Sequence, residues 1–509
     1  MKPLNLADLT IEQKIGQMLL CRRPLNDEDK EYILELIRNR SLGGIHGMFP
    51  ELLETADYPL LICENMESGF PKGEAELTCP LAIGATGSEE YAYEFGRISA
   101  IEAKAKGYNV VFGPIFDIAL NPAAFCGGSL RFGGNKELVS RLGAAAVRGY
   151  QDQGMIVTAK HYPGFGESAI DSHLEMVYLK CDKKLLLERE LEPYRYAIEH
   201  ADLSGVMVGH ITVPKIDDKY PASLSPKITN ILREIGFDGL TMTDSLAMLG
   251  ITNYYGLEEC HALAMTAVDM VMASYRVPAK MAYEFMLNAY RKGRVTEEQI
   301  DEAVRRVIAA QNKTLKKPET TKLTHKEMNL AKEISRDSIT ALLDGVDSTA
   351  IPTDGRHLFI LETPNVFKHP ETGYMEEEKS NLNKIENLIK EKFPNSDTAK
   401  INKFPNTSQM EQTITKTMNY NSIIIVTYNR TSGYTGSADA TRRFLALINA
   451  VAHKLSAIII FGNPFPAREY PRTPRLIIGY ENGSCEEEVI NVLTGESIAK
   501  GKLPIDLVR

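Results

Sequence analysis

The first 310 residues of this chain alternate two kinds of segment, and this alternation limits the folds that the chain can adopt. Short apolar, β-branched runs are typical of buried strands, and longer stretches between them carry apolar residues at helical spacing. Strands are expected at Gly44–Phe49, Leu60–Glu64, Asn109–Ile115, Ile156–Ala159, Gly205–Val208, Leu240–Thr243 and Asp269–Ala273. Helices are expected at the amphipathic N-terminus and at Glu89–Ala105, Lys136–Asp152, Lys183–His200 and Pro226–Ile235.

Seven or eight such units in series favour an α/β fold with a TIM-type (β/α)8-like barrel, in which chemistry gathers at the carboxyl ends of the strands. We assign residues 1–311 to this barrel, the polar stretch 312–325 to a linker and residues 326–509 to a smaller α/β sandwich domain. Strands are expected there at His357–Leu361, Ser422–Thr427, Ser456–Phe461 and Arg475–Gly479. Helices are expected at Lys326–Leu343, Glu376–Glu391, Ala438–His453 and Glu486–Leu493, whereas Asn395–Thr415 gives no clear pattern.

The composition excludes several classes of partner. The 58 basic and 67 acidic residues give a net charge of −9, and no basic arm or stripe points to nucleic acid. No apolar run reaches the roughly 18 residues that cross a bilayer, and the N-terminus shows no secretory signal. The seven cysteines are scattered without a CxxC pair, which suits a reducing compartment, so we expect a cytoplasmic protein.

Two groups of polar residues follow the strand expected at Ile156–Ala159. Lys160 and His161 open a turn rich in Gly and Pro, at the mouth of the expected barrel. In Asp171-Ser172-His173, the carboxylate can hold one imidazole nitrogen and leave the other free to move a proton. The alternatives are a plain loop with a solvated lysine and a turn cap with an exposed histidine.

Two aspartates end strands in the same way. Asp244 follows Leu240–Thr243 and can serve as a nucleophile, a base or a metal ligand, or it can cap the next helix. Asp117 follows Asn109–Ile115 and carries the same alternatives, while Asp269 begins a strand and is interpreted as structural. No short histidine pair or HExxH motif supports a metal site, and no phosphate-binding glycine loop supports a nucleotide, so we expect neither a metal nor a cofactor.

Together these motifs resemble glycoside hydrolase family 3, and within it the bacterial β-N-acetylglucosaminidase branch. The resemblance runs along nearly the whole chain, from Ile11–Met18 to Gly501–Pro504. Its most specific part is Lys160-His161-Tyr162-Pro163-Gly164 followed by Asp171-Ser172-His173, which marks the branch that moves protons with a loop histidine.

The resemblance implies a retaining exo-β-glycosidase, most simply a β-N-acetylhexosaminidase that releases GlcNAc-type sugars from the nonreducing end of an oligosaccharide or glycoconjugate. Asp244 would form the covalent glycosyl-enzyme, and His173, oriented by Asp171, would be the acid/base. The positions that bind sugar hydroxyls in the family are Lys160, His161, Arg131, Asp117 and Asn65.

The chain departs from the family in the segment Asn65–Phe70. An amide at Asn65 replaces the usual Asp, Phe70 replaces an Arg, and Phe165 stands where a second histidine is common. The chain has no Trp, so Tyr162, Phe116 or Phe165 would supply any apolar platform for the sugar. The departures leave the exact sugar and linkage open.

Two other functions stay open at this point. A phosphorylase on the same sugar fits because a neutral imidazole repels an incoming phosphate less than a carboxylate does. A noncatalytic sugar-binding protein fits the altered segment Asn65–Phe70 but does not need Asp171, His173 and Asp244 together. The sequence carries no sign of the oligomeric state.

Overall fold

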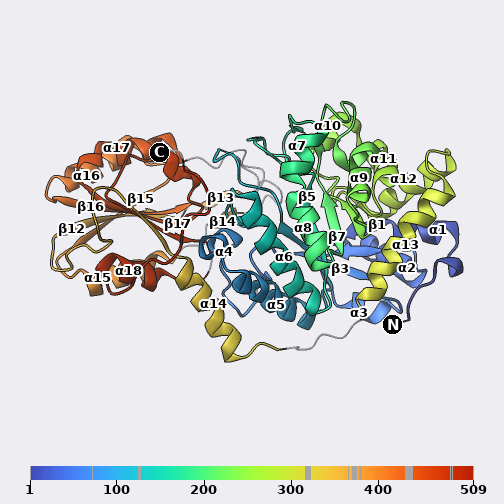
Figure 1. Ribbon diagram of the computed structural model, residues 1–509, viewed down its shortest axis with the longest axis horizontal. Coiled ribbons are helices and arrows are strands. Elements are labelled where there is room, and N and C mark those ends of the chain that lie inside the picture. Colours follow the sequence, from blue (N-terminus) through green and yellow to red (C-terminus); the bar gives the residue numbers. More distant parts are fainter. Residues whose placement is uncertain are drawn as a thin grey trace. The chain divides into compact units, whose positions relative to one another are not determined.

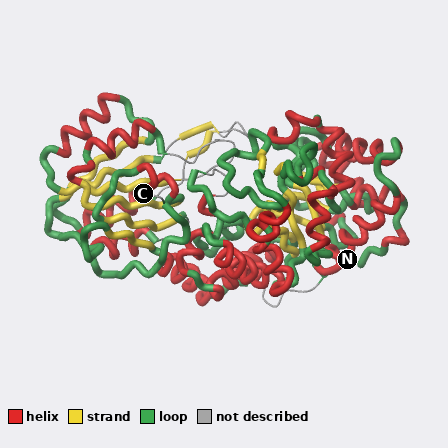
Figure 2. Tube along the Cα trace, turned by 45° about the horizontal axis from the view of Figure 1, so that its top comes forward, coloured by secondary structure: helices red, strands yellow, loops and turns green. Residues whose placement is uncertain are grey.

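A computed structural model gives the structure of residues 2–71, 73–123, 128–315, 322–364, 366–368, 375–377, 381–429, 440–481, 483 and 485–507. The chain forms two compact units, each with strands inside and helices around them (Figures 1 and 2). The first unit comprises Met1–Ala75, Glu89–Ile118 and Asn135–Glu327, and the second comprises Glu76–Ser88, Ala119–Gly134 and Met328–Arg509.

The first unit is the expected parallel barrel. Its eight-stranded sheet runs in the order β10-β1-β2-β3-β4-β5-β7-β9 within the described residues, and a bridge between Met242 and Met270 joins the two outer strands. Apolar side chains from most strands fill the interior, among them Leu20, Phe112 and Met207. The strands are β1 (Leu19–Arg22), β2 (Gly44–His46), β3 (Leu61–Asn65), β4 (Val110–Ile115), β5 (Ile156–Tyr162), β7 (Gly205–Val208), β9 (Leu240–Thr243) and β10 (Val271–Met272).

The helices of this unit surround the strands (Figure 2). They are α1 (Ile11–Gln17), α2 (Asp27–Arg38), α3 (Glu51–Thr55), α5 (Glu89–Ala105), α6 (Lys136–Asp152), α7 (Lys183–Leu185), α8 (Glu192–Ala201), α9 (Pro226–Glu234), α10 (Leu249–Tyr255), α11 (Leu257–Ala267), α12 (Ala279–Arg291) and α13 (Glu297–Lys313). A short pair of strands, β6 (Val177–Tyr178) and β8 (Ile211–Thr212), lies in the loops after β5 and β7.

The N-terminal helix is present as α1, but the strand β1 that follows it was not expected. Two local expectations for the barrel were wrong. The helix expected at Lys183–His200 is divided, because Leu186–Glu190 forms a π-helical turn and a new helix begins at Glu192, with Pro193 in its first turn. The strand β5 continues to Tyr162, so Lys160 and His161 lie in the strand and not in the turn after it.

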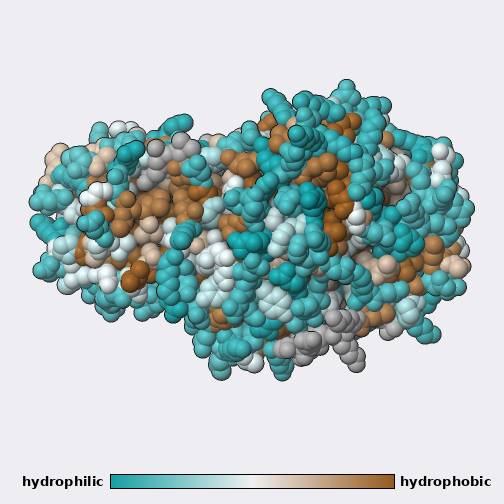
Figure 3. Space-filling view, in the orientation of Figure 1, coloured by the Kyte–Doolittle hydropathy of each residue, from teal (hydrophilic) through white to brown (hydrophobic). Residues whose placement is uncertain are grey.

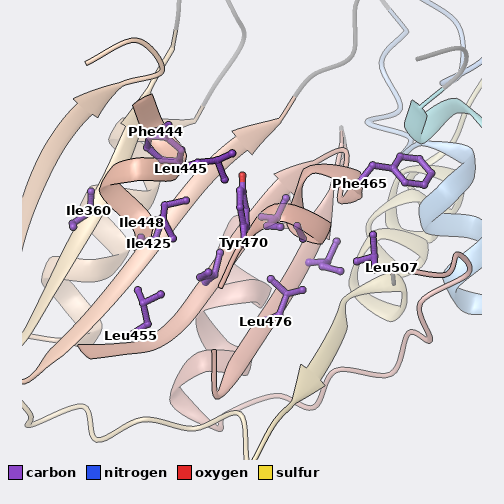
Figure 4. Close-up of a cluster of buried hydrophobic side chains, with 14 of the residues drawn as sticks. Ile360, Ile425, Phe444, Leu445, Ile448, Leu455, Phe465, Tyr470, Leu476 and Leu507 are labelled. Atoms are coloured by element: carbon purple, nitrogen blue, oxygen red, sulfur yellow. The ribbon is translucent and has the colours of Figure 1, made fainter. Parts of the chain in front are cut away.

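The second unit is a six-stranded sheet in the order β11-β18-β17-β16-β12-β15, with only β11 antiparallel to its neighbour among the described strands. Side chains of β12 alternate between the two faces, with Leu358 and Ile360 in one core and Phe359 and Leu361 in the other. Figure 1 places α16 and α17 over one face and α15 and α18 over the other, and Figure 4 shows the first core around Ile425. The strands are β11 (Thr340–Leu343), β12 (His357–Thr363), β15 (Asp397–Asn402), β16 (Ser422–Asn429), β17 (Leu455–Gly462) and β18 (Arg475–Tyr480), besides the hairpin β13 (Val366–Lys368) and β14 (Met375–Glu377). The helices are α4 (Pro80–Thr86), α14 (His325–Ser338), α15 (Leu382–Lys392), α16 (Thr407–Thr417), α17 (Arg442–Ala450) and α18 (Glu486–Thr494).

The two units do not divide the chain at a single point. Residues 76–88 and 119–134 fall within the expected barrel domain 1–311 but cluster with the second unit, because Leu81 and Ala82 of α4 enter its core and the Cys79 N–H donates to the Glu481 carbonyl. Residues 316–321 of the expected linker lie outside the described residues, as do residues 430–439, which include the start of the helix expected at Ala438–His453.

Two expectations for the second unit were also wrong. The helix expected at Lys326–Leu343 ends at Ser338, and the β-branched pair after it leads into β11. The helix expected at Glu376–Glu391 begins only at Leu382, and Glu376 and Glu377 belong to β14. The segment without a clear pattern in the sequence contains β15 and the start of α16.

Among the described residues, no helix is both long and apolar enough to cross a membrane. The face of the molecule in Figure 3 carries mostly hydrophilic side chains, with hydrophobic ones scattered among them.

Candidate functional site

Asp244 is the first residue after β9, at the carboxyl end of a central barrel strand. Its N–H donates to the Val208 carbonyl (2.9 Å), and its Oδ1 accepts from the N–H of Ser245 (2.6 Å). His210 lies beside this turn and is fully buried, with Nε2 3.0 Å from the Ser245 carbonyl and Nδ1 2.8 Å from the Ser223 hydroxyl. Because a carbonyl only accepts, Nε2 carries the proton, and His210 acts as a neutral support of the turn.

The surroundings of Asp244 favour its ionised form. Burial opposes ionisation, but the electrostatic effect of nearby side chains, with His161 the largest, outweighs burial and lowers the pKa of the Asp244 carboxyl below its usual value. Burial also lowers the pKa of His210, in line with its neutral form. The carboxylate of Asp244 is therefore an anion, partly exposed, at the carboxyl end of the barrel strands.

His161 and Asp117 form a second fixed pair at the same end. The Asp117 Oδ2 lies 2.8 Å from His161 Nδ1, and Oδ1 accepts from the His161 N–H at 3.3 Å. Asp117 is 2% exposed, so both of its oxygens serve His161. This bond sets Nδ1 as the donor and leaves Nε2 on the side of Asp244, 3.9 Å from its Oδ2.

Lys160 joins Asn65 to Glu67. Its buried ammonium donates to the Asn65 Oδ1 (3.1 Å) and forms an ion pair with Glu67. A lysine ammonium can only donate, so the amide oxygen of Asn65 must face Lys160 and the amide N–H₂ must face elsewhere. Asn65 itself is exposed at the end of β3.

The dyad expected in the loop after β5 is present. His173 Nδ1 lies 2.7 Å from Asp171 Oδ1, and the same oxygen accepts from the His173 N–H at 3.0 Å. Asp171 is buried, while the His173 side chain is 32% exposed. The carboxylate thus holds one ring nitrogen, and Nε2 is the nitrogen that can transfer a proton.

The other residues expected at the site are buried in the fold. Arg131 is fully buried and belongs to the second compact unit. Tyr162, Phe116 and Phe165 are buried too, so they do not offer the exposed apolar platform that was expected. Tyr162 is held by its hydroxyl on the Ile228 carbonyl, and Phe165 packs edge-on to His161 at 5.4 Å between ring centroids.

Sequence reasoning missed two supporting residues. Glu67 lies in the segment Asn65–Phe70, which was considered only for its departures from the family pattern. Its ion pair with Lys160 could not be predicted, because it joins residues at the ends of β3 and β5, which are far apart in sequence. His210 has no local motif that indicates a supporting role, and both its ring nitrogens have protein partners. Asp269 is structural, as expected, because it accepts from the N–H and hydroxyl of Thr241.

The arrangement combines an anionic carboxylate, an imidazole held through one of its nitrogens, and several ammonium, amide and imidazole groups that can form hydrogen bonds with hydroxyl groups. Within the residues described by the structure, no cluster of three or more His, Cys, Asp or Glu side chains could hold a metal ion. The chemistry that these groups can carry is nucleophilic attack by Asp244 with proton transfer by His173.

Comparison with known proteins shows the family to which this chain belongs. The model of the glycosyl hydrolase family 3 N-terminal domain matches residues 10–310. A β-N-acetylglucosaminidase/β-glucosidase from Cellulomonas fimi is 30% identical over 335 residues, which cover 60% of this chain and 58% of that protein. The structure of a glycoside hydrolase family 3 β-N-acetylglucosaminidase from a Paenibacillus species matches with a TM-score of 0.84 and 28% identity over 98% of this chain and 99% of that one. A β-glucoside phosphorylase shares the fold (TM-score 0.82, 22% identity, 99% and 95% coverage). The chain therefore belongs to glycoside hydrolase family 3.

Proposed function

We propose that this protein is a retaining exo-β-glycosidase, most simply a β-N-acetylhexosaminidase that releases GlcNAc-type sugars from the nonreducing end of an oligosaccharide or glycoconjugate. The observation that carries the proposal is the ionised Asp244 at the end of β9 together with the Asp171–His173 dyad on the loop after β5. The named relatives from Cellulomonas fimi and Paenibacillus support the choice of sugar.

In the first step, a carboxylate oxygen of Asp244 attacks the anomeric carbon while the bond to the leaving oxygen breaks. Oδ1 is already bound by the Ser245 N–H, which keeps the carboxylate in one orientation during the attack. The proton on His173 Nε2 passes to the leaving oxygen, so the aglycone departs as a neutral alcohol. The product is a covalent glycosyl ester of Asp244.

In the second step, His173 is neutral and its Nε2 takes a proton from water. The water oxygen bonds to the anomeric carbon, and the ester bond to Asp244 breaks, which restores the carboxylate and the configuration of the sugar. Asp171 holds Nδ1 as a donor through both steps and stabilises the imidazolium form by its charge.

Sugar hydroxyls would bind to the remaining hydrogen-bond groups. Lys160 has three donors, two of which serve Asn65 and Glu67, so one is left for the sugar. Asn65 would offer its N–H₂ as a donor where an aspartate would accept. Asp117 acts through His161, whose Nε2 faces the nucleophile. A contact from Arg131 stays a prediction.

A panel of aryl β-glycosides, run with and without phosphate, tests the proposal. The panel holds the N-acetylglucosaminide, N-acetylgalactosaminide, glucoside, galactoside and xyloside. Phosphate-independent turnover of one acetamido sugar is the expected result. A rate that rises with phosphate and yields a sugar 1-phosphate would make the protein a phosphorylase instead. Binding of a sugar without turnover of any substrate would contradict catalysis.

We also propose a cytoplasmic location. The six cysteines within the described residues are buried and free, which suits a reducing compartment. Fractionation of the producing cells tests this, and recovery of the protein with secreted or surface material would contradict it.

A further inference from the structure

The loop that carries His173 meets the N-terminus of α10, the helix that follows Asp244. The His173 carbonyl accepts a hydrogen bond from the N–H of Leu249, the first residue of α10, at 2.9 Å. An N–H in the first turn of a helix has no acceptor within that helix. The loop therefore supplies the acceptor, and the two catalytic segments are joined by their backbones.

The next residue of α10, Gly250, is buried against the same loop. A Cβ added there would lie 2.3 Å from the Ser172 carbonyl oxygen and 2.5 Å from that of Glu175. Both oxygens belong to backbone, which cannot turn aside as a flexible side chain can. Since ordinary contact begins at 3.4 Å, any larger residue would move the loop by about 1 Å.

Glycine at position 250 is needed for packing against the loop and not for its backbone conformation. The residue is helical and has no left-handed φ angle, so an alanine meets no backbone strain. Alanine also has a higher helix propensity than glycine. The close contact with the loop is therefore the feature that requires glycine at position 250.

The other end of the loop has a separate anchor. Val177 and Tyr178 pair with Ile211 and Thr212, and the N–H of Leu179 donates to the Thr212 carbonyl at 2.8 Å. Loss of the contact at Gly250 would leave this anchor in place. The segment around His173 would then shift while the barrel stays folded.

We propose that Gly250 is a positioning residue for the reaction: its missing side chain lets the loop of the proton-transferring His173 lie on the helix that follows the nucleophile. This inference rests on the proposed function. It assigns a kinetic role to a residue that touches no substrate.

Gly250→Ala, with Asn253→Ala as its control, tests the kinetic part. Asn253 is exposed on the same helix, so its change raises helix propensity without touching the loop. For Gly250→Ala we expect kcat/KM to fall about 10²-fold on an aryl glycoside with a poor leaving group, the loss expected for a misplacement of about 1 Å. With 2,4-dinitrophenolate, which leaves without protonation, kcat/KM should fall less than about threefold. The control should keep the parent rates on both.

Hydrogen exchange at the Leu249 amide tests the contact without turnover. In the parent this amide should be protected by the His173 carbonyl; in Gly250→Ala it should exchange at least tenfold faster, while amides of the central strands stay protected. Unchanged exchange and rates in a folded Gly250→Ala would overturn the inference, as would an equal loss on both substrates. A parent that turns over no glycoside would instead overturn the proposed function, and the exchange result would still report the contact.

Discussion

Replacing Asp171 by Asn isolates the contribution of its charge to proton transfer. One oxygen of Asp171 accepts from both the N–H and the Nδ1 of His173, at 3.0 and 2.7 Å. Only an oxygen can accept both bonds, so the amide oxygen of the substituted side chain must take this place, and the ring keeps its position and tautomer. What disappears is the negative charge beside the imidazolium.

The size of the effect follows from Coulomb's law. Two unit charges about 4 Å apart attract by about 4 kcal/mol at an effective dielectric constant of about 20 and by about 1 kcal/mol in water. Because the His173 side chain is 32% exposed, its environment lies between these limits. The rate at neutral pH should therefore fall roughly 5- to 10³-fold.

The assay is kcat/KM for a series of aryl glycosides that differ in leaving group. In Asp171→Asn the loss should appear for poor leaving groups and nearly vanish for 2,4-dinitrophenolate. An equal loss for all leaving groups, or no loss, would refute the assigned role.

Three further predictions concern sugar recognition, the nucleophile and stability. Asn65→Asp should change the ratio of kcat/KM for the N-acetylglucosaminide to that for the N-acetylgalactosaminide by at least about tenfold, because a hydrogen bond to a charged acceptor contributes about 1.5–3 kcal/mol. An unchanged ratio would contradict a contact between Asn65 and the sugar. His161→Gln removes a charge that lowers the pKa of Asp244, so the acid limb of the pH–rate profile should move to higher pH, and a fixed limb would contradict this. Burial opposes ionisation of Glu327, but hydrogen bonds from Thr324 and Arg97 lower its pKa to about 2. Glu327→Gln should cost about 1–3 kcal/mol of stability near pH 7. This difference should be complete above about pH 4.5 and disappear as the pH falls towards 2, as thermal unfolding against pH would show; a pH-independent difference would contradict the ion pair.

The sequence predicted the barrel because its strands are buried on both sides and read as apolar runs between amphipathic helices. Leu240–Thr243 and Gly205–Val208 have the bounds that the pattern indicated. The strand β1 escaped prediction because Leu19–Arg22 follows α1 without a break and its apolar residues continue the helical pattern. Four residues are too few for their period to be recognised.

From the sequence, only those contacts of the site that join residues close together in the chain could be predicted. The pairing of Asp171 with His173 spans two residues and was visible, whereas that of Asp117 with His161 requires β4 and β5 to be neighbours. The role of Gly250 has no local sign at all, since it arises from the approach of a distant loop to a helix.

The most direct test of the account is to trap the glycosyl-enzyme with a fluorinated sugar substrate that forms the intermediate faster than it releases it. Mass spectrometry of the digested protein should find one sugar residue on the peptide that contains Asp244, and the adduct should be absent from Asp244→Asn. Turnover of glycosides without any such adduct, or an adduct on another carboxylate, would contradict the assignment of Asp244 as the nucleophile.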